Sequence, residues 1–256
     1  MAAAYGTQRP SVPGRTDPQE RRKGYDEFMM LTGTGTRDKV SQKSLNFHAT
    51  PRVATRALMR LEKLPHVIYE PMAGNGAIVL PLREEGHIVI ASDLVGRGCP
   101  DCEAGVDFLA VKEAPSSVQA CISNPPYNRC EEIIYHALYS LNIPKVYMLL
   151  RWAFMEGGNL KSKKGEWRRQ ILDGGHLAKV LLFRKRLPMF HREGWEGKKL
   201  SNSGMPMGWF CWDLAHQGSP TTIERVDYIP ERDPLADSVC SMILPPTPLE
   251  AYIASH

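Results

Sequence analysis

The stretch Ser123-Asn124-Pro125-Pro126-Tyr127 holds the residues of this chain that are best suited to bind a planar amine. Tandem prolines fix φ at both positions and remove two backbone donors, and each pushes the preceding residue into an extended conformation. The carbonyl groups of such a rigid turn are not absorbed into a helix. Asn124 adds a side-chain acceptor and Tyr127 adds an aromatic face. An amino group placed here would meet two acceptors for its N–H bonds and a ring on which to stack.

A glycine-rich turn lies earlier in the chain. The sequence Glu70-Pro71-Met72-Ala73-Gly74-Asn75-Gly76 follows a short apolar run, and residues 78–85 have a helical pattern. Glycines at such a turn let the backbone approach a ligand closely. The spacing is not that of a dinucleotide site, because Val79 stands where a third glycine is needed, and the lysine of a phosphate-binding loop is missing.

Two acidic residues follow, Asp93 at the end of the second expected strand and Asp107 at the close of the third unit, after the loop at residues 95–106. Asp93 stands 17 residues after Gly76, where a carboxylate can accept hydrogen bonds from both hydroxyls of a ribose. Asp107 could accept the amino group of an adenine, with Phe108 against the base; the alternative is an ordinary surface acid. Together these positions predict a cofactor that contains a nucleoside and has no large phosphate requirement.

The elements expected around these residues alternate between helix and strand. Strands are predicted at residues 67–69, 87–91, 118–122 and 145–150, and helices at 50–64, 78–85 and 131–141. Because parallel neighbours need crossover connections, this alternation predicts an α/β fold with a doubly wound, mostly parallel sheet. Open sheets of this kind bind ligands outside the carboxyl ends of their strands, where all four features above would meet.

The ends of the chain differ from its middle. Residues 1–45 are rich in Gly, Pro and basic residues and predict a flexible basic arm, while residues 231–256 predict a Pro-rich tail. One domain is expected over residues 46–230. Strands at 177–183 and 207–214 would form a terminal antiparallel pair in its sheet. Thr50 is expected to cap the first helix, with Pro51 at its first position.

Composition favours a soluble protein. Hydrophobic residues make up 43% of the 256 residues and charged residues 23%, as in ordinary globular proteins. No apolar run approaches the roughly 20 residues of a membrane span, and the N-terminus lacks the pattern of a secretory signal, so the expected location is the cytoplasm. Cys99 and Cys102 are closely spaced, but no second ligand pair follows, so we expect a reduced loop and no metal site.

Positive charge is concentrated in one region. Residues 151–200 contain 13 Lys/Arg and 5 Asp/Glu, a net charge of +8, whereas the whole chain carries +4. The rest of the chain therefore carries −4. A basic region on a mildly acidic body is typical of a protein that binds a polyanion, although a solvated face without a partner has the same composition. The aromatic residues within this region that could stack on bases are Trp152, Trp167, Phe190 and Trp195.

Four features occur in a fixed order: the glycine turn at residues 70–76, Asp93, Asp107-Phe108, and Asn124-Pro125-Pro126-Tyr127. In this order they resemble the S-adenosylmethionine-dependent amino-methyltransferases, above all the small, phage-type N6-adenine DNA methyltransferases. The resemblance spans roughly residues 48–150, and the Asn-Pro-Pro-Tyr tetrad is its most specific part. It implies the Rossmann-like fold of class I methyltransferases.

The resemblance also implies a role for each matching residue. The glycine turn would line the methionine part of S-adenosylmethionine, Asp93 the ribose, and Asp107 and Phe108 the adenine. Asn124 and the Pro125 carbonyl would accept hydrogen bonds from the target amino group, and Tyr127 would stack on a base flipped out of the duplex. The implied cofactor-binding residues are Thr50, Glu70, Pro71, Ala73, Gly74, Asn75, Gly76, Asp93, Leu94, Asp107, Phe108 and Asn124. Nucleic-acid contacts are expected in the basic, aromatic insertions at residues 151–206.

Other substrates remain open at this point. The same tetrad occurs in enzymes that methylate the glutamine amide of translation release factors, although these normally carry a helical domain before the glycine turn. Amino groups of RNA bases and N4 of cytosine are further alternatives. A nucleic-acid-binding module that keeps the fold without catalysis is a hypothesis of a different class.

Overall fold

The computed structural model describes residues 50–156, 161–187, 205–218 and 220–229. The predicted N-terminal arm and Pro-rich tail lie outside these residues, as do Phe190 and Trp195. The chain separates into two units, Met1–Val40 and Ser41–His256, and all the described residues belong to the second.

Helices and strands alternate along the described chain. In order they are α2 (Arg52–Leu61), β1 (Val67–Glu70), α3 (Val79–Glu84), β2 (Ile88–Asp93), β3 (Cys102–Ala104), η1 (Phe108–Ala110), β4 (Ala120–Ser123), α4 (Cys130–Tyr135), η2 (His136–Ser140), β5 (Lys145–Arg151), η3 (Trp152–Met155), α5 (Lys163–Asp173), β6 (Leu177–Phe183), β7 (Met207–Asp213) and β8 (Thr222–Val226).

These strands form one sheet of eight strands in the order β3-β2-β1-β4-β5-β7-β6-β8. The first five strands in this order are mutually parallel. Strand β7 runs antiparallel to both β5 and β6. The sheet therefore confirms the predicted α/β fold, with a mostly parallel, doubly wound sheet and a terminal antiparallel strand pair. Strand β8, which the sequence did not predict, pairs parallel with β6 at the edge.

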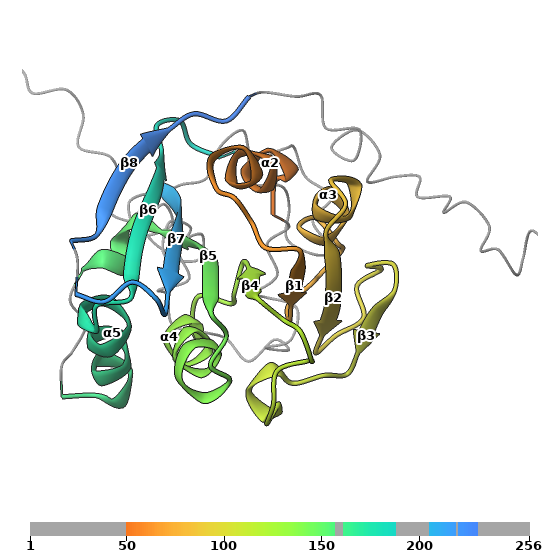
Figure 1. Ribbon diagram of the computed structural model, residues 1–256, viewed down its shortest axis with the longest axis horizontal. Helices are drawn as coiled ribbons and strands as arrows, with labels where there is room; N and C mark the ends of the chain where they lie inside the picture. The colour runs from red at the N-terminus through yellow and green to blue at the C-terminus, as the bar shows by residue number, and fades with distance from the viewer. Residues whose placement is uncertain (1–49, 157–160, 188–204, 219, 230–256) are drawn as a thin grey trace, which may run out of the picture. The chain divides into compact units, whose positions relative to one another are not determined.

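Helices cover both faces of the sheet. Figure 1 shows α2 and α3 towards the top of the view and α4 and α5 towards the bottom, with the strands between them. Alternate residues of each central strand point to opposite faces. In β5, Tyr147 and Leu149 pack in the cluster that contains α2 and α3, whereas Val146 and Met148 pack in the cluster that contains α4 and α5.

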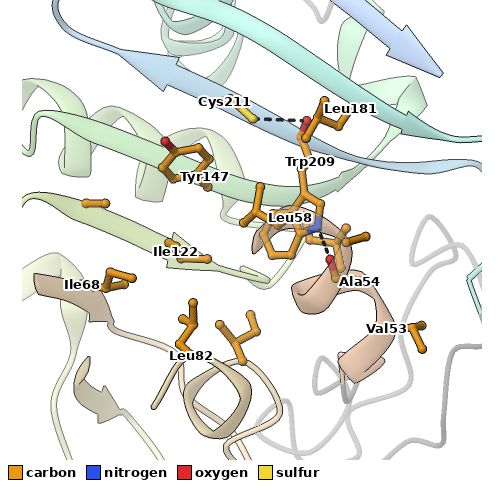
Figure 2. Packing of buried hydrophobic residues seen from close by; sticks show 14 of the residues in the cluster. Val53, Ala54, Leu58, Ile68, Leu82, Ile122, Tyr147, Leu181, Trp209 and Cys211 are labelled. Atoms are coloured by element: carbon orange, nitrogen blue, oxygen red, sulfur yellow. Dashed lines mark hydrogen bonds between the residues drawn. The ribbon is translucent and has the colours of Figure 1, made fainter. Parts of the chain in front are cut away.

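Trp209 of β7 fixes α2 against the sheet. Its ring is fully buried, and its indole Nε1 donates a hydrogen bond to the Ala54 carbonyl at 2.8 Å (Figure 2). Leu58 and Val53 of α2 belong to the same buried cluster. This packing sets the position of Thr50, two residues before the helix, which lines the cavity at the carboxyl ends of the strands.

The structure corrects several local expectations. Thr50 does not cap α2: Pro51 occupies the N-cap position, and no side chain caps the helix. The helix expected at 131–141 is α4 followed by the π-helical turn η2. Strand β3 and helix α5 lie where no element was predicted. Among the described residues, no helix has the length and apolar character needed to cross a bilayer.

Candidate active site

A cavity of about 390 Å³ lies at the carboxyl ends of β1, β2 and β4. Parallel strands β1 and β4 are neighbours here, and the chain winds outward from them in both directions, to β2 and to β5. This is the switch point where open α/β sheets bind ligands. Every site residue predicted from the sequence lines the cavity except Glu70 and Gly76.

The glycine turn is fastened to the end of β2. The Asp93 carboxylate accepts hydrogen bonds from Gly74 N at 2.7 Å and from Val95 N at 2.9 Å. Both glycines have positive φ, 55° at Gly74 and 82° at Gly76, which only glycine adopts without strain. A Cβ on Gly76 would also lie 3.1 Å from Cys99 Sγ. Each oxygen of Asp93 keeps further acceptor capacity for a ligand hydroxyl.

Asp107 and Phe108 form the next part of the wall. Asp107 is exposed, and its Oδ1 accepts a hydrogen bond from Leu109 N at 3.1 Å, which starts the short helix η1. Phe108 is only 4% exposed and meets the rings of Tyr69 and His136 edge to face, at centroid distances of 5.9 and 5.1 Å. These contacts fix the ring of Phe108 in the cavity wall.

Asn124 and Pro125 lie directly after the end of β4, the strand that pairs with β1. Asn124 Nδ2 donates to Thr50 Oγ1 at 3.1 Å, so the amide presents its carbonyl oxygen as the acceptor. Thr50, expected as a helix cap, instead orients this amide. Pro125 is buried in the cavity wall.

Tyr127 is held by a residue that the sequence did not single out. The guanidinium of Arg151, the last residue of β5, lies over the Tyr127 ring at 4.3 Å from its centroid. The hydroxyl of Tyr127 lies 4.0 Å from Met207 Sδ. Burial raises the pKa of Tyr127 to about 12, so the side chain is a neutral phenol at physiological pH. Burial lowers the pKa of Arg151, and the field of Tyr127 opposes this.

Glu70 and Gly76 were expected in the cavity wall, and the structure places them elsewhere. Gly76 faces Cys99 behind the turn. Glu70 is fully buried beneath the cavity and bonds to Ser123 and Met72. A strand end can point a side chain either to the ligand or into the sheet, and the pattern of residue types did not distinguish the two.

The first turn of α5 contacts a residue of the cavity wall. Lys164 Nζ donates to the carbonyl of Asn128 at 2.5 Å, and Asn128 is a cavity residue that directly follows Tyr127. Lys161 and Lys163 are exposed beside it. We call Lys161, Lys163 and Lys164 the α5 lysine cluster.

Arg168, another cation of α5, has a structural role. Arg168 pairs with the buried carboxylate of Glu131 at 2.5 Å and lies over the Phe154 ring, 4.9 Å from its centroid. Its guanidinium links α5 to α4, whereas the lysine cluster faces solvent.

Additional wall residues follow the predicted ones closely in sequence. Met72 lies inside the glycine turn, and Asn128 and Arg129 continue the tetrad. Their proximity to the motifs was the signal that could have identified them. Arg97, in the loop after β2, carried no such signal.

No protein-family model matches the sequence, and no curated protein matches it. Several solved structures are similar in fold at low identity. They include a type I restriction-modification methyltransferase subunit from Streptococcus thermophilus (12% identity, TM-score 0.46, covering 80% of this chain and 50% of that one). They also include a modification subunit of a putative type I restriction enzyme from Vibrio vulnificus (10%, 0.44, 82% and 52%) and the 23S rRNA methyltransferase ErmE (17%, 0.42, 68% and 72%).

This chain spans about half the length of the two restriction-modification subunits. At these identities and TM-scores the likeness is distant. The function proposed below therefore rests on the residues of the cavity.

Proposed function

We propose that this protein is an S-adenosylmethionine-dependent methyltransferase that acts on an exocyclic amino nitrogen, N6 of adenine in DNA. One observation carries this proposal: residues suited to a nucleoside cofactor and residues suited to an amine line the same cavity. Its volume of about 390 Å³ lies in the range of cofactor pockets. A binding module without catalysis would not need cofactor-binding residues and amine-binding residues in one cavity.

The cavity residues fit the cofactor part by part. Asp93 accepts hydrogen bonds from the ribose hydroxyls, while Asp107 accepts one from the adenine amino group and Phe108 packs against the base. Ala73, Gly74 and Asn75 line the cavity, and their backbone would hold the methionine part of the cofactor in close approach. When bound, S-adenosylmethionine supplies an electrophilic methyl group.

Asn124 and Pro125 prepare the target nitrogen. The Asn124 side-chain carbonyl and the Pro125 backbone carbonyl accept its two N–H bonds, which aims the nitrogen lone pair into the cavity. As positive charge develops on the nitrogen, these fixed dipoles stabilise it without reorganisation. Thr50 holds the Asn124 amide in the required orientation. No strong general base is needed, because the proton can leave after transfer.

Tyr127 and the α5 lysine cluster are the proposed contacts to the nucleic acid. Arg151 covers one face of the Tyr127 ring, and the ring lines the cavity, where a target base would stack on it. A base in a duplex reaches such a pocket only after flipping out of the stack, at a cost of a few kcal/mol. Phosphate contacts from the lysine cluster would offset this cost, because each neutralised phosphate releases counterions.

The test measures cofactor binding and methyl transfer separately. We expect heat of binding with S-adenosylmethionine in calorimetry, and transfer of labelled methyl groups to unmethylated DNA. RNA and a translation release factor are assayed in parallel. Label only on the release factor or RNA would contradict the DNA assignment, and no binding of S-adenosylmethionine would contradict the whole proposal.

Asn124→Ala provides the matched variant. It removes an amine acceptor but leaves the ribose and adenine contacts, so we expect unchanged cofactor affinity and a loss of transfer of about a hundredfold to a thousandfold. Equal losses in cofactor affinity and transfer would show that Asn124 serves the cofactor instead of the amine.

A further inference from the structure

Glu70 is a buried acid without a matching cation. Its side chain is 0% exposed at the carboxyl end of β1. Its Oε1 accepts hydrogen bonds from Ser123 Oγ at 2.6 Å and from Met72 N at 3.0 Å. Its Oε2 is buried and has no hydrogen-bond partner among the described residues.

These two hydrogen bonds connect the glycine turn to the loop that contains Asn124. Met72 belongs to the glycine turn and lines the cavity, while Ser123 immediately precedes Asn124 and is itself 0% exposed. The parallel pairing of β1 with β4 brings the two strand ends together. Glu70 is thus the side chain through which the cofactor-side turn and the amine-side loop are hydrogen-bonded to one another.

The surroundings of Glu70 favour its neutral form. Burial raises the pKa of Glu70 to about 8; the hydrogen bonds from Ser123 and Met72 oppose this rise, and the charge of Asp93 adds to it. Other titratable groups that lie near it are Tyr69 and the thiols of Cys99, Cys102 and Cys121, and none of these is a cation. A proton on Oε2 leaves Oε1 as the acceptor of both observed hydrogen bonds, and a neutral buried group costs far less than an unpaired charge.

We propose that Glu70 is a protonated positioning residue that couples the glycine turn to the Asn124 loop from beneath the cavity, and that it does not contact the cofactor. Its role in transfer rests on the function proposed above. Its protonation is a property of the folded protein and is testable independently.

The first experiment compares the pH dependence of stability in the wild type and in Glu70→Gln, which is neutral at every pH and keeps an Oε1 acceptor. A pKa raised above the ordinary 4.5 in the folded state stabilises that state fully below pH 4.5 and loses this effect as the pH rises to about 8. The unfolding constant of the wild type relative to the variant should therefore rise about tenfold per pH unit in this window and be flat above it.

Glu113→Gln, at an exposed position, is the control and should show no such trend. A difference between wild type and Glu70→Gln that is independent of pH would mean that Glu70 has an ordinary pKa in the folded protein, and would overturn the proposal. This outcome does not depend on any enzymatic activity.

The second experiment tests whether Glu70 couples the glycine turn to the Asn124 loop. Glu70→Gln should keep cofactor affinity and transfer, and should lose the decline in transfer that the wild type shows above about pH 8. Ser123→Ala should lower kcat about tenfold, the equivalent of one hydrogen bond, with cofactor affinity unchanged.

Weaker cofactor binding in a folded Glu70→Gln variant would identify a direct cofactor contact and refute the positioning role. If the wild type transfers no methyl group to any substrate, the proposed function fails, while the stability curves still decide the protonation of Glu70.

Discussion

Tyr127 is held by Arg151 and Met207, which are far from it in the sequence, and by nearby Cys130. Arg151 covers one face at 4.3 Å, Met207 lies at the hydroxyl, and Cys130 Sγ donates to the Tyr127 carbonyl at 3.2 Å. A ring that is already immobilised loses little conformational entropy when a base stacks on it. In the proposed function, Arg151 would therefore hold the stacking surface in place without itself contacting the base.

Arg151→Met tests whether the contact of Arg151 with the Tyr127 ring supports the binding of nucleic acid. Methionine keeps much of the apolar stem but removes the cation–π contact, worth about 0.5–2 kcal/mol. We expect several-fold weaker binding of the target nucleic acid, with unchanged affinity for S-adenosylmethionine. Arg225→Met, at an exposed position of β8, should leave both affinities unchanged. Wild-type nucleic-acid affinity in Arg151→Met would show that the contact with Tyr127 is incidental.

At the residue scale the sequence predicted which side chains gather, but not how each is held. Asn124, Asp93 and the glycines were identifiable because their chemistry and their places at strand ends coincide. The pairing of Arg151 with Tyr127 depends on β4 and β5 being neighbours and on a side-chain rotamer. The burial of Glu70 depends on the direction of one side chain, which a motif does not encode.

Strand β7 is the element that completes the sheet. It is inserted antiparallel between β5 and β6, and six of its seven residues are buried. Gly208 lets the strands approach: a Cβ there would lie 2.8 Å from the Leu181 carbonyl oxygen and 3.2 Å from Leu182 Cα in β6. Because both atoms belong to the backbone, they cannot move aside cheaply.

Gly208→Ala should therefore destabilise the fold. Overpacking of this kind costs about 1–3 kcal/mol, measurable as a lower midpoint in urea denaturation. Gly96→Ala is the control, since its Cβ would make an ordinary contact of 3.4 Å with Ala104 Cβ at the surface. Equal stability of the two variants would mean that the backbone of β6 shifts to accommodate the added Cβ without a loss of stability.

The elements that the sequence failed to predict have weak patterns. Strand β3 has only three residues, none of them buried, so it shows no alternation. In α5 only Gly165 and Ile171 are buried, and the helix is specified by the Ser162 side chain, which accepts a hydrogen bond from Gly165 N. The central strands were predictable because their buried, apolar residues run almost without interruption.

For the molecule as a whole, the distribution of positive charge indicates where a polyanionic partner would bind. The predicted excess of cations at residues 151–200 includes the α5 lysine cluster, whose Lys164 contacts a residue of the cavity wall, and Arg168, which is used within the fold. Of these two, the lysine cluster is the one exposed to a polyanion in solution. The basic stretch at residues 188–204 lies outside the described residues.

The salt dependence of nucleic-acid binding tests this assignment. Each lysine of the α5 cluster is changed to Gln in turn, as Lys161→Gln, Lys163→Gln and Lys164→Gln. Removing one phosphate-binding lysine should reduce the slope of log affinity against log salt by about one. Arg225→Gln should leave the slope unchanged. Unaltered slopes in all three lysine variants would place the phosphate contacts elsewhere.

The most direct test of the central claim is nucleoside analysis of unmethylated DNA after incubation with the protein and S-adenosylmethionine. We predict that N6-methyl-2′-deoxyadenosine accumulates with the wild type and forms about a hundredfold to a thousandfold more slowly with Asn124→Ala. Methylated cytosine in its place, or no methylated nucleoside from a protein that binds the cofactor, would contradict the account.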